Sequence, residues 1–162
     1  MSPLTILLVE DNACDQRLVA KALEESNCGT RLQIVGDGEE AISYLRGQGK
    51  YRDAPSPQLI ILDLNLPRKD GRQVLAEIRG ESSLKDMPVV IWTGAETTPD
   101  MDAIRQLNPT SYLTKPDDLD NYFAAIRAIE EYAHNIAAFP DREKEYALFP
   151  PGSCSARRRP RG

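Results

Sequence analysis

The chain alternates between short apolar runs and segments in which apolar residues recur every three or four positions. Short apolar runs predict strands, and the three-to-four spacing predicts helices with one buried side. We expect strands at residues 4–9, 31–35, 58–63, 87–93 and 110–116. We expect helices at about 15–26 and 39–47, around 74–78 and 101–107, and from Leu119 to Ile136. Residues 47–57 contain Gly, Pro and charge without periodicity, which indicates an exposed loop.

This alternation predicts an α/β fold, a five-stranded parallel sheet with helices on both faces. The strands support the prediction independently, because runs such as TILLV and LIIL are continuously apolar. Continuous apolar runs are typical of strands buried on both sides. In such folds ligands bind beyond the carboxyl ends of the strands, where the strand order reverses.

Polar residues stand at four of these carboxyl ends: Glu10 and Asp11, Asp63, Thr93, and Lys115. Two carboxylates about 5 Å apart repel by roughly 3 kcal/mol at an effective dielectric constant near 20. A cluster of three acids therefore predicts a bound cation beyond the single charge of Lys115. Mg²⁺ prefers oxygen ligands and fits this expectation. With the Thr93 hydroxyl, the set suits a phosphoryl group carried by an aspartate.

Each residue also has an ordinary structural interpretation. A strand-end acid alone is usually a helix cap or a loop acid, Asn12 or Asp11 being candidate caps for the first helix. Thr93 alone would bond to backbone, and Lys115 alone would be solvated. Only their convergence favours a functional site.

Composition narrows the function further. The net charge of −5 argues against direct nucleic-acid binding, although the last seven residues carry four Arg. Three cysteines without a CxxC pair fit free thiols in a reducing cytosol. The first apolar stretch breaks at Glu10 and no basic segment precedes it, so we expect neither a signal peptide nor a membrane span. We therefore expect a cytoplasmic protein.

The pattern divides the chain into three parts. Residues 1–136 form the expected domain, and residues 150–162 are expected to be a disordered basic tail. Between them, the arm at 137–149 carries large apolar residues that are costly to expose: Phe139, Tyr146, Leu148 and Phe149. We expect this arm and the last helix to pack on a second copy, giving a homodimer.

Four motifs in this order, LLVEDN, LDLNLPRKDG, VVIWTGA and YLTKP, resemble the receiver domains of two-component response regulators. The resemblance covers about residues 4–136 and implies the receiver type of flavodoxin-like fold. It implies that Asp63 accepts a phosphoryl group from a sensor histidine kinase. It also implies Mg²⁺ held by Asp11, Asp63 and the Asn65 backbone carbonyl, with Glu10 acting through water.

The same resemblance assigns the remaining motif residues. Thr93 and Lys115 would bind phosphoryl oxygens, and Tyr112 would be the aromatic switch that follows Thr93. The Lys115–Pro116 peptide bond would be cis. The protein would be a phosphorylated switch and not an enzyme, beyond slow self-dephosphorylation.

A narrower resemblance is to the small receivers that partner bacterial phytochromes, which would make a phytochrome histidine kinase the upstream partner. In that subgroup the C-terminal helix and extension tend to support dimers. About 26 residues follow Ile136, too few for a DNA-binding output domain, so we expect output through interaction.

Two other functions compete with this interpretation. A pseudo-receiver that never accepts phosphate would be expected to lack an acid, the Thr or the Lys, and here all are present. A Mg²⁺-dependent phosphatase with an Asp nucleophile would need a second Asp two residues after Asp63, where this chain has Asn65. Nucleotide hydrolysis by a P-loop has less support still, because no GxxxxGK[ST] occurs in the chain.

Overall fold

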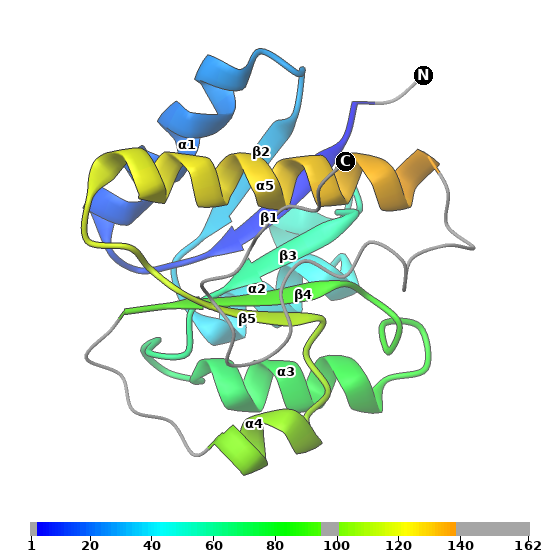
Figure 1. Cartoon of the computed structure of the whole chain (residues 1–162). Coiled ribbons are helices and arrows are strands. Elements are labelled where there is room, and N and C mark those ends of the chain that lie inside the picture. Colours follow the sequence, from blue (N-terminus) through cyan, green and yellow to red (C-terminus); the bar gives the residue numbers. More distant parts are fainter. Residues whose placement is uncertain (1–2, 95–100, 139–162) are drawn as a thin grey trace.

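A computed structural model describes residues 3–94 and 101–138. Its strands form one five-stranded sheet in the order β2-β1-β3-β4-β5, and every neighbouring pair is parallel. Figure 1 shows this twisted sheet through the middle of the molecule. The strands are β1 (Thr5–Val9), β2 (Arg31–Val35), β3 (Leu59–Leu62), β4 (Val89–Thr93) and β5 (Ser111–Thr114). The predicted fold class is confirmed.

Helices lie on both faces of the sheet. Helices α1 and α5 cover one face, and α2, α3 and α4 cover the other (Figure 1). Their bounds are α1 (Ala13–Ser26), α2 (Gly38–Arg46), α3 (Gly71–Gly80), α4 (Met101–Gln106) and α5 (Leu119–Ala138). Within the described residues, no helix is long and apolar enough to cross a membrane.

The loop after α2 and the end of α5 differ from the expectation. The loop at 47–57 contains a short 3₁₀ helix, η1 (Gly49–Tyr51). Helix α5 continues through Ala138, two residues past the expected end of the domain. Residues 139–162, which include most of the predicted arm and the whole predicted tail, lie outside the described residues.

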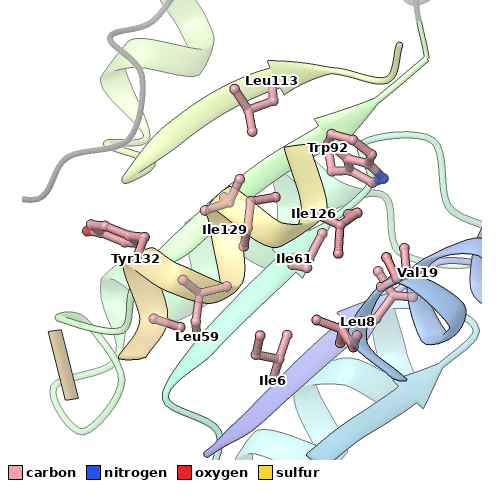
Figure 2. Packing of buried hydrophobic residues seen from close by; sticks show 14 of the residues in the cluster. Ile6, Leu8, Val19, Leu59, Ile61, Trp92, Leu113, Ile126, Ile129 and Tyr132 are labelled. Atoms are coloured by element: carbon pink, nitrogen blue, oxygen red, sulfur yellow. The ribbon is translucent and has the colours of Figure 1, made fainter. Parts of the chain in front are cut away.

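Alternate residues of the central strands build two separate cores. Ile6 and Leu8 of β1 pack toward α1 and α5, in a cluster that includes Trp92 and Ile126 (Figure 2). Leu7 and Val9 pack toward α2 and α3 on the other face. All four β1 side chains are fully buried, and each contributes about 1.5–3 kcal/mol through burial. Burial on both faces explains why these strands are continuously apolar.

Strand β2 lies at the edge of the sheet and is less buried. Of its five residues only Val35 is buried, while Arg31 and Ile34 are exposed. The mixed sequence RLQIV fits this edge position, because an edge strand has one side open to solvent.

Helix caps account for several of the acids and amides that follow strands. Asn12 caps α1, its Oδ1 accepting the Asp15 N–H at 2.9 Å, so α1 begins two residues earlier than expected. Asp37 caps α2 by accepting the Glu40 N–H at 2.8 Å. Asp70 and Gln73 form a capping box at α3. These residues therefore have the structural role that Glu10 and Asp63 lack.

Two glycines pack closely against the backbone that connects β3 to α3. A Cβ at Gly71 would lie 2.3 Å from the Asp63 carbonyl oxygen, and a Cβ at Gly38 would lie 1.9 Å from the Lys69 carbonyl oxygen. Both distances are far inside van der Waals contact. Only glycine therefore lets α3 approach the Asp63 backbone and α2 approach the Lys69 backbone.

Candidate functional site

The carboxyl ends of β1, β3 and β5 open into one pocket of about 610 Å³. Glu10, Asp11, Asp63, Asn65 and Lys115 all line it. The pocket lies beyond β1 and β3, the neighbouring strands at which the chain order of the sheet reverses. The predicted convergence of these residues is thus what the fold produces.

Lys115 is the positive centre of the pocket. Its Nζ lies 2.8 Å from Glu10 Oε1, 3.0 Å from Asp15 Oδ2 and 3.4 Å from Asp63 Oδ2. The lysine side chain is only 13% exposed. One ammonium group therefore serves three carboxylates, with one contact for each of its three donors.

Two hydrogen bonds hold the Asp63 carboxylate at the end of β3. The Thr93 hydroxyl donates to Asp63 Oδ1 at 3.1 Å, and the Asn65 backbone N–H donates to the same oxygen at 3.1 Å. Thr93 is fully buried and Asp63 is 6% exposed. The carboxylate is thus fixed in the pocket, with a hydroxyl and an ammonium beside it.

Three carboxylates are close enough to share a metal ion. Oxygen atoms of Glu10, Asp11 and Asp63 all lie within 4.8 Å of one another, and Asp11 is exposed to the pocket side. An all-oxygen donor set with an exposed member suits a hard divalent cation that keeps some of its waters. The residues present therefore fit the metal that the sequence predicts.

Burial shapes the electrostatics of this group. Glu10 is 1% exposed. Its burial, with the negative charge of Asp63 nearby, raises the pKa of Glu10 to about 7, although the hydrogen bond from Lys115 opposes the shift. Burial alone would lower the pKa of the Lys115 ammonium, but the hydrogen bond and charge of Glu10 and the charge of Asp63 raise that pKa above its usual value. Lys115 is therefore held in its charged form.

Tyr112 lies in β5 and faces the core beneath α4. It is 9% exposed and belongs to the cluster that contains Ile91 and Ile104. Burial raises the pKa of its hydroxyl, with Arg72 opposing the shift. The ring is thus on the same face of the sheet as α3 and α4, and its expected role as a switch stays a prediction.

The expected cis peptide bond before Pro116 is wrong for this structure. The described residues contain no cis peptide bond, so the Lys115–Pro116 bond is trans. The trans form of an X–Pro bond is favoured by about 0.5–1 kcal/mol unless the surroundings demand the other isomer. Here Lys115 reaches all three carboxylates with the bond trans, so its contacts impose no such demand.

Asp15 and Tyr122 are among the pocket residues that sequence reasoning did not single out. Asp15 pairs with Lys115, and the Tyr122 hydroxyl donates to Asp15 Oδ1 at 2.6 Å. Asp15 stands in the first turn of α1, where an acid is common for reasons of helix stability alone. A signal was present, since Asp15 stands in the first turn of the helix that directly follows β1, and so begins at the same edge of the sheet as Asp11.

Comparisons with known proteins agree with this geometry. The family model of the response regulator receiver domain matches residues 6–127. The response regulator Rcp1 of Synechocystis sp. is 45% identical over 138 residues, which cover 85% of this chain and 94% of Rcp1.

Solved structures give the same result. The phosphorylated cyanobacterial phytochrome response regulator RcpA superposes with a TM-score of 0.76 and 42% identity, covering 82% of this chain and 95% of RcpA. The Mn²⁺-bound form of Rcp1 superposes with a TM-score of 0.73 and 45% identity, covering 80% of this chain and 93% of Rcp1. The bacteriophytochrome response regulator AtBRR gives a TM-score of 0.66 at 34% identity, covering 78% and 92%.

The family model matches most of the chain. The matched part contains the strand order β2-β1-β3-β4-β5 and the acids at the ends of β1 and β3. It also contains the hydroxyl and the ammonium group beside Asp63. The chain belongs to the response regulator receiver domain family.

Proposed function

We propose that this response regulator is switched by phosphorylation of Asp63, with a sensor histidine kinase as donor and Mg²⁺ as cofactor. The observation that carries the proposal is the environment of the Asp63 carboxylate. Thr93 donates to one of its oxygens at 3.1 Å, and Lys115 lies 3.4 Å from the other. A hydroxyl and an ammonium on opposite oxygens of a buried acid suit a phosphoryl group placed between them.

The chemical step follows from this arrangement. An Asp63 carboxylate oxygen forms a bond to phosphorus as the P–N bond of the kinase phosphohistidine breaks, and the imidazole leaves with the electron pair of that bond. Lys115 offsets the negative charge of the phosphoryl oxygens, and the Thr93 hydroxyl donates a hydrogen bond to one of them. Held by Asp11, Asp63 and the Asn65 carbonyl, with Glu10 acting through water, Mg²⁺ would neutralise charge on the same oxygens.

The switch begins with the rearrangement of Thr93. Its hydroxyl contacts Asp63 Oδ1, and it would move to a phosphoryl oxygen once Asp63 carries the acyl phosphate. Tyr112 lies on the next strand, whose register pairs Thr93 with Thr114 and Ile91 with Tyr112. A shift of Thr93 therefore alters the space available to the Tyr112 ring, which transmits the change to the α4 face.

The relatives suggest the upstream partner. RcpA is a phytochrome response regulator and AtBRR is a bacteriophytochrome response regulator, so we propose a phytochrome histidine kinase as the donor. Transfer of labelled phosphate from such a kinase, in a light-dependent manner, tests this. Equal transfer from kinases of other sensor classes would contradict the assignment.

Dimerisation is a separate part of the proposal. The end of α5 and residues 137–149 carry apolar side chains that a second copy would cover. Sedimentation of the full chain and of a chain truncated after Ile136 tests the idea, and we expect the truncated chain to dissociate at a higher concentration. An unchanged sedimentation profile would remove the arm from the interface.

The deciding experiment is intact-mass measurement after incubation with acetyl phosphate and Mg²⁺. We expect the wild type to gain the mass of one phosphoryl group, and neither the Asp63→Asn variant nor a chelator-treated sample to gain it. A wild type that gains no mass from acetyl phosphate or from a kinase would instead favour a pseudo-receiver. The phosphatase alternative has less support, because Asn65 occupies the position of the general acid.

A further inference from the structure

Asp15 connects three parts of the molecule through its two carboxylate oxygens. Its Oδ2 lies 3.0 Å from Lys115 Nζ, and its Oδ1 accepts the Tyr122 hydroxyl at 2.6 Å. Asp15 belongs to α1, Lys115 follows β5, and Tyr122 belongs to α5. Each oxygen thus has its own partner, and the carboxylate forms a bridge from α5 to the lysine of the pocket.

Asp15 and Tyr122 are each held in place by further contacts. The Asp15 backbone N–H donates to the Asn12 cap of α1 at 2.9 Å. Tyr122 is 4% exposed, and its ring packs edge-to-face on Trp92 with ring centres 5.1 Å apart. Burial raises the pKa of the Tyr122 hydroxyl, so it remains a donor over the whole working pH range. The Asp15 carboxylate therefore has little freedom to turn away from Lys115.

Asp15 differs from the other two partners of Lys115 in what phosphorylation does to it. Asp63 would lose its free carboxylate on forming the acyl phosphate, and Glu10 belongs to the group of acids that fits a metal. Asp15 is absent from that group and undergoes no chemistry in the proposed reaction. Its contact with Lys115 can therefore persist through the reaction without competition from the metal or from the chemistry at Asp63.

We propose that Asp15, held by Tyr122, is a positioning residue that keeps the Lys115 ammonium directed at the phosphoryl oxygens of Asp63. This inference rests on the proposed function and extends it to two residues outside the family motifs quoted above. The competing interpretation is purely structural, with the Asp15–Tyr122 contact joining α1 to α5 and affecting stability alone.

The test measures the rate of phosphorylation by acetyl phosphate at saturating Mg²⁺, using intact mass, in Asp15→Asn, Tyr122→Phe and the double variant. Asn keeps the shape of Asp and an oxygen that can accept from Tyr122, and it removes only the charge that holds Lys115. We expect Asp15→Asn to be about tenfold slower, and Tyr122→Phe about threefold slower. Because Tyr122 acts through Asp15, the double variant should be no slower than Asp15→Asn.

Two further variants separate positioning from stability. Asp15→Glu keeps the charge and should recover part of the lost rate. Tyr44→Phe removes another tyrosine hydroxyl bond, from Tyr44 to the Pro55 carbonyl at 2.7 Å, away from the pocket, and should phosphorylate at the wild-type rate. All rates are measured well below the melting temperature of each variant.

The outcomes distinguish the inference from the proposed function. A wild type that is phosphorylated, with Asp15→Asn and Tyr122→Phe at the wild-type rate, overturns the positioning role and leaves the phosphorylation of Asp63 standing. If the rate losses of the two single variants multiply in the double variant, the claim that Tyr122 acts through Asp15 is overturned. A wild type that accepts no phosphoryl group from any donor overturns the proposed function itself, and the positioning role with it.

Discussion

Replacement of Lys115 by Ala is the perturbation for which the structure gives the clearest magnitude. The attraction of Lys115 Nζ to Glu10 Oε1 at 2.8 Å is about 6 kcal/mol at an effective dielectric constant near 20. Desolvation of both groups offsets part of it. Deleting one partner of a buried ion pair generally costs about 3–5 kcal/mol, because the remaining charge stays buried without compensation. Here Glu10 and Asp63 would both lose their shared cation.

We therefore expect the free energy of unfolding of metal-free Lys115→Ala to fall by about 3 kcal/mol, measured by urea denaturation. In a chain of this length that loss corresponds to a melting temperature roughly 10 °C lower. Added Mg²⁺ should recover more stability in the variant than in the wild type, since the metal then becomes the main counter-charge of the acids.

Lys21→Ala is the matched control. Lys21 is 62% exposed, and within the described part of the chain its one ion pair is with Glu25 at 3.8 Å on the surface of α1. Its loss should therefore change stability by less than about 0.5 kcal/mol. If Lys115→Ala is as stable as this control, and its stabilisation by Mg²⁺ equals that of the wild type, the claim that Lys115 compensates the buried acids is refuted.

Three other changes test separate parts of the site and its support. The pKa of Glu10 in the folded protein is about 7, above its ordinary value of 4.5. The contribution of Glu10 to stability is therefore complete below about pH 4.5 and is lost as the pH rises through the folded pKa. Chelator-treated protein should thus lose about 1 kcal/mol of stability between about pH 6 and about pH 8, and Glu10→Gln, measured by the same denaturation, should lose this dependence. Gly71→Ala should destabilise the fold by at least about 2 kcal/mol, because the new Cβ would meet the Asp63 carbonyl oxygen. A Cβ at Gly80 would meet no atom within 4 Å, so Gly80→Ala should be neutral or stabilising; thermal melts measure both variants. Thr93→Ala should still gain the phosphoryl mass but leave the fluorine NMR signal of labelled Tyr112 unchanged on phosphorylation; a shift like that of the wild type would contradict the coupling.

The sequence predicted the fold because its strands are buried on both faces. Runs such as LIIL have no polar residue that could face solvent. Such strands fit a parallel sheet that is covered by helices on both faces. The polar strand ends then located the pocket without further information. The edge strand β2 was recognised although only Val35 is buried, because helical patterns stand on both sides of it.

Contacts that depend on the third dimension were not predictable in this way. Asp15 reads as an ordinary first-turn acid, and its contact with Tyr122 joins residues 107 positions apart. The 3₁₀ helix at Gly49–Tyr51 is too short to show a period. The Lys115–Pro116 bond, which the family resemblance implies to be cis, is trans, the isomer that an X–Pro bond favours by default.

The glycine contact behind Asp63 also limits how the site can respond. A Cβ at Gly71 would meet only backbone atoms of Asp63 and Leu64, so no side chain is available there to rotate and absorb a displacement. The α3 side of the Asp63 backbone is therefore rigid. We expect the volume of an added phosphoryl group to be accommodated instead by rotatable side chains, beginning with Thr93, which contacts Asp63 Oδ1. One glycine thereby directs the response of the domain toward β4 and β5.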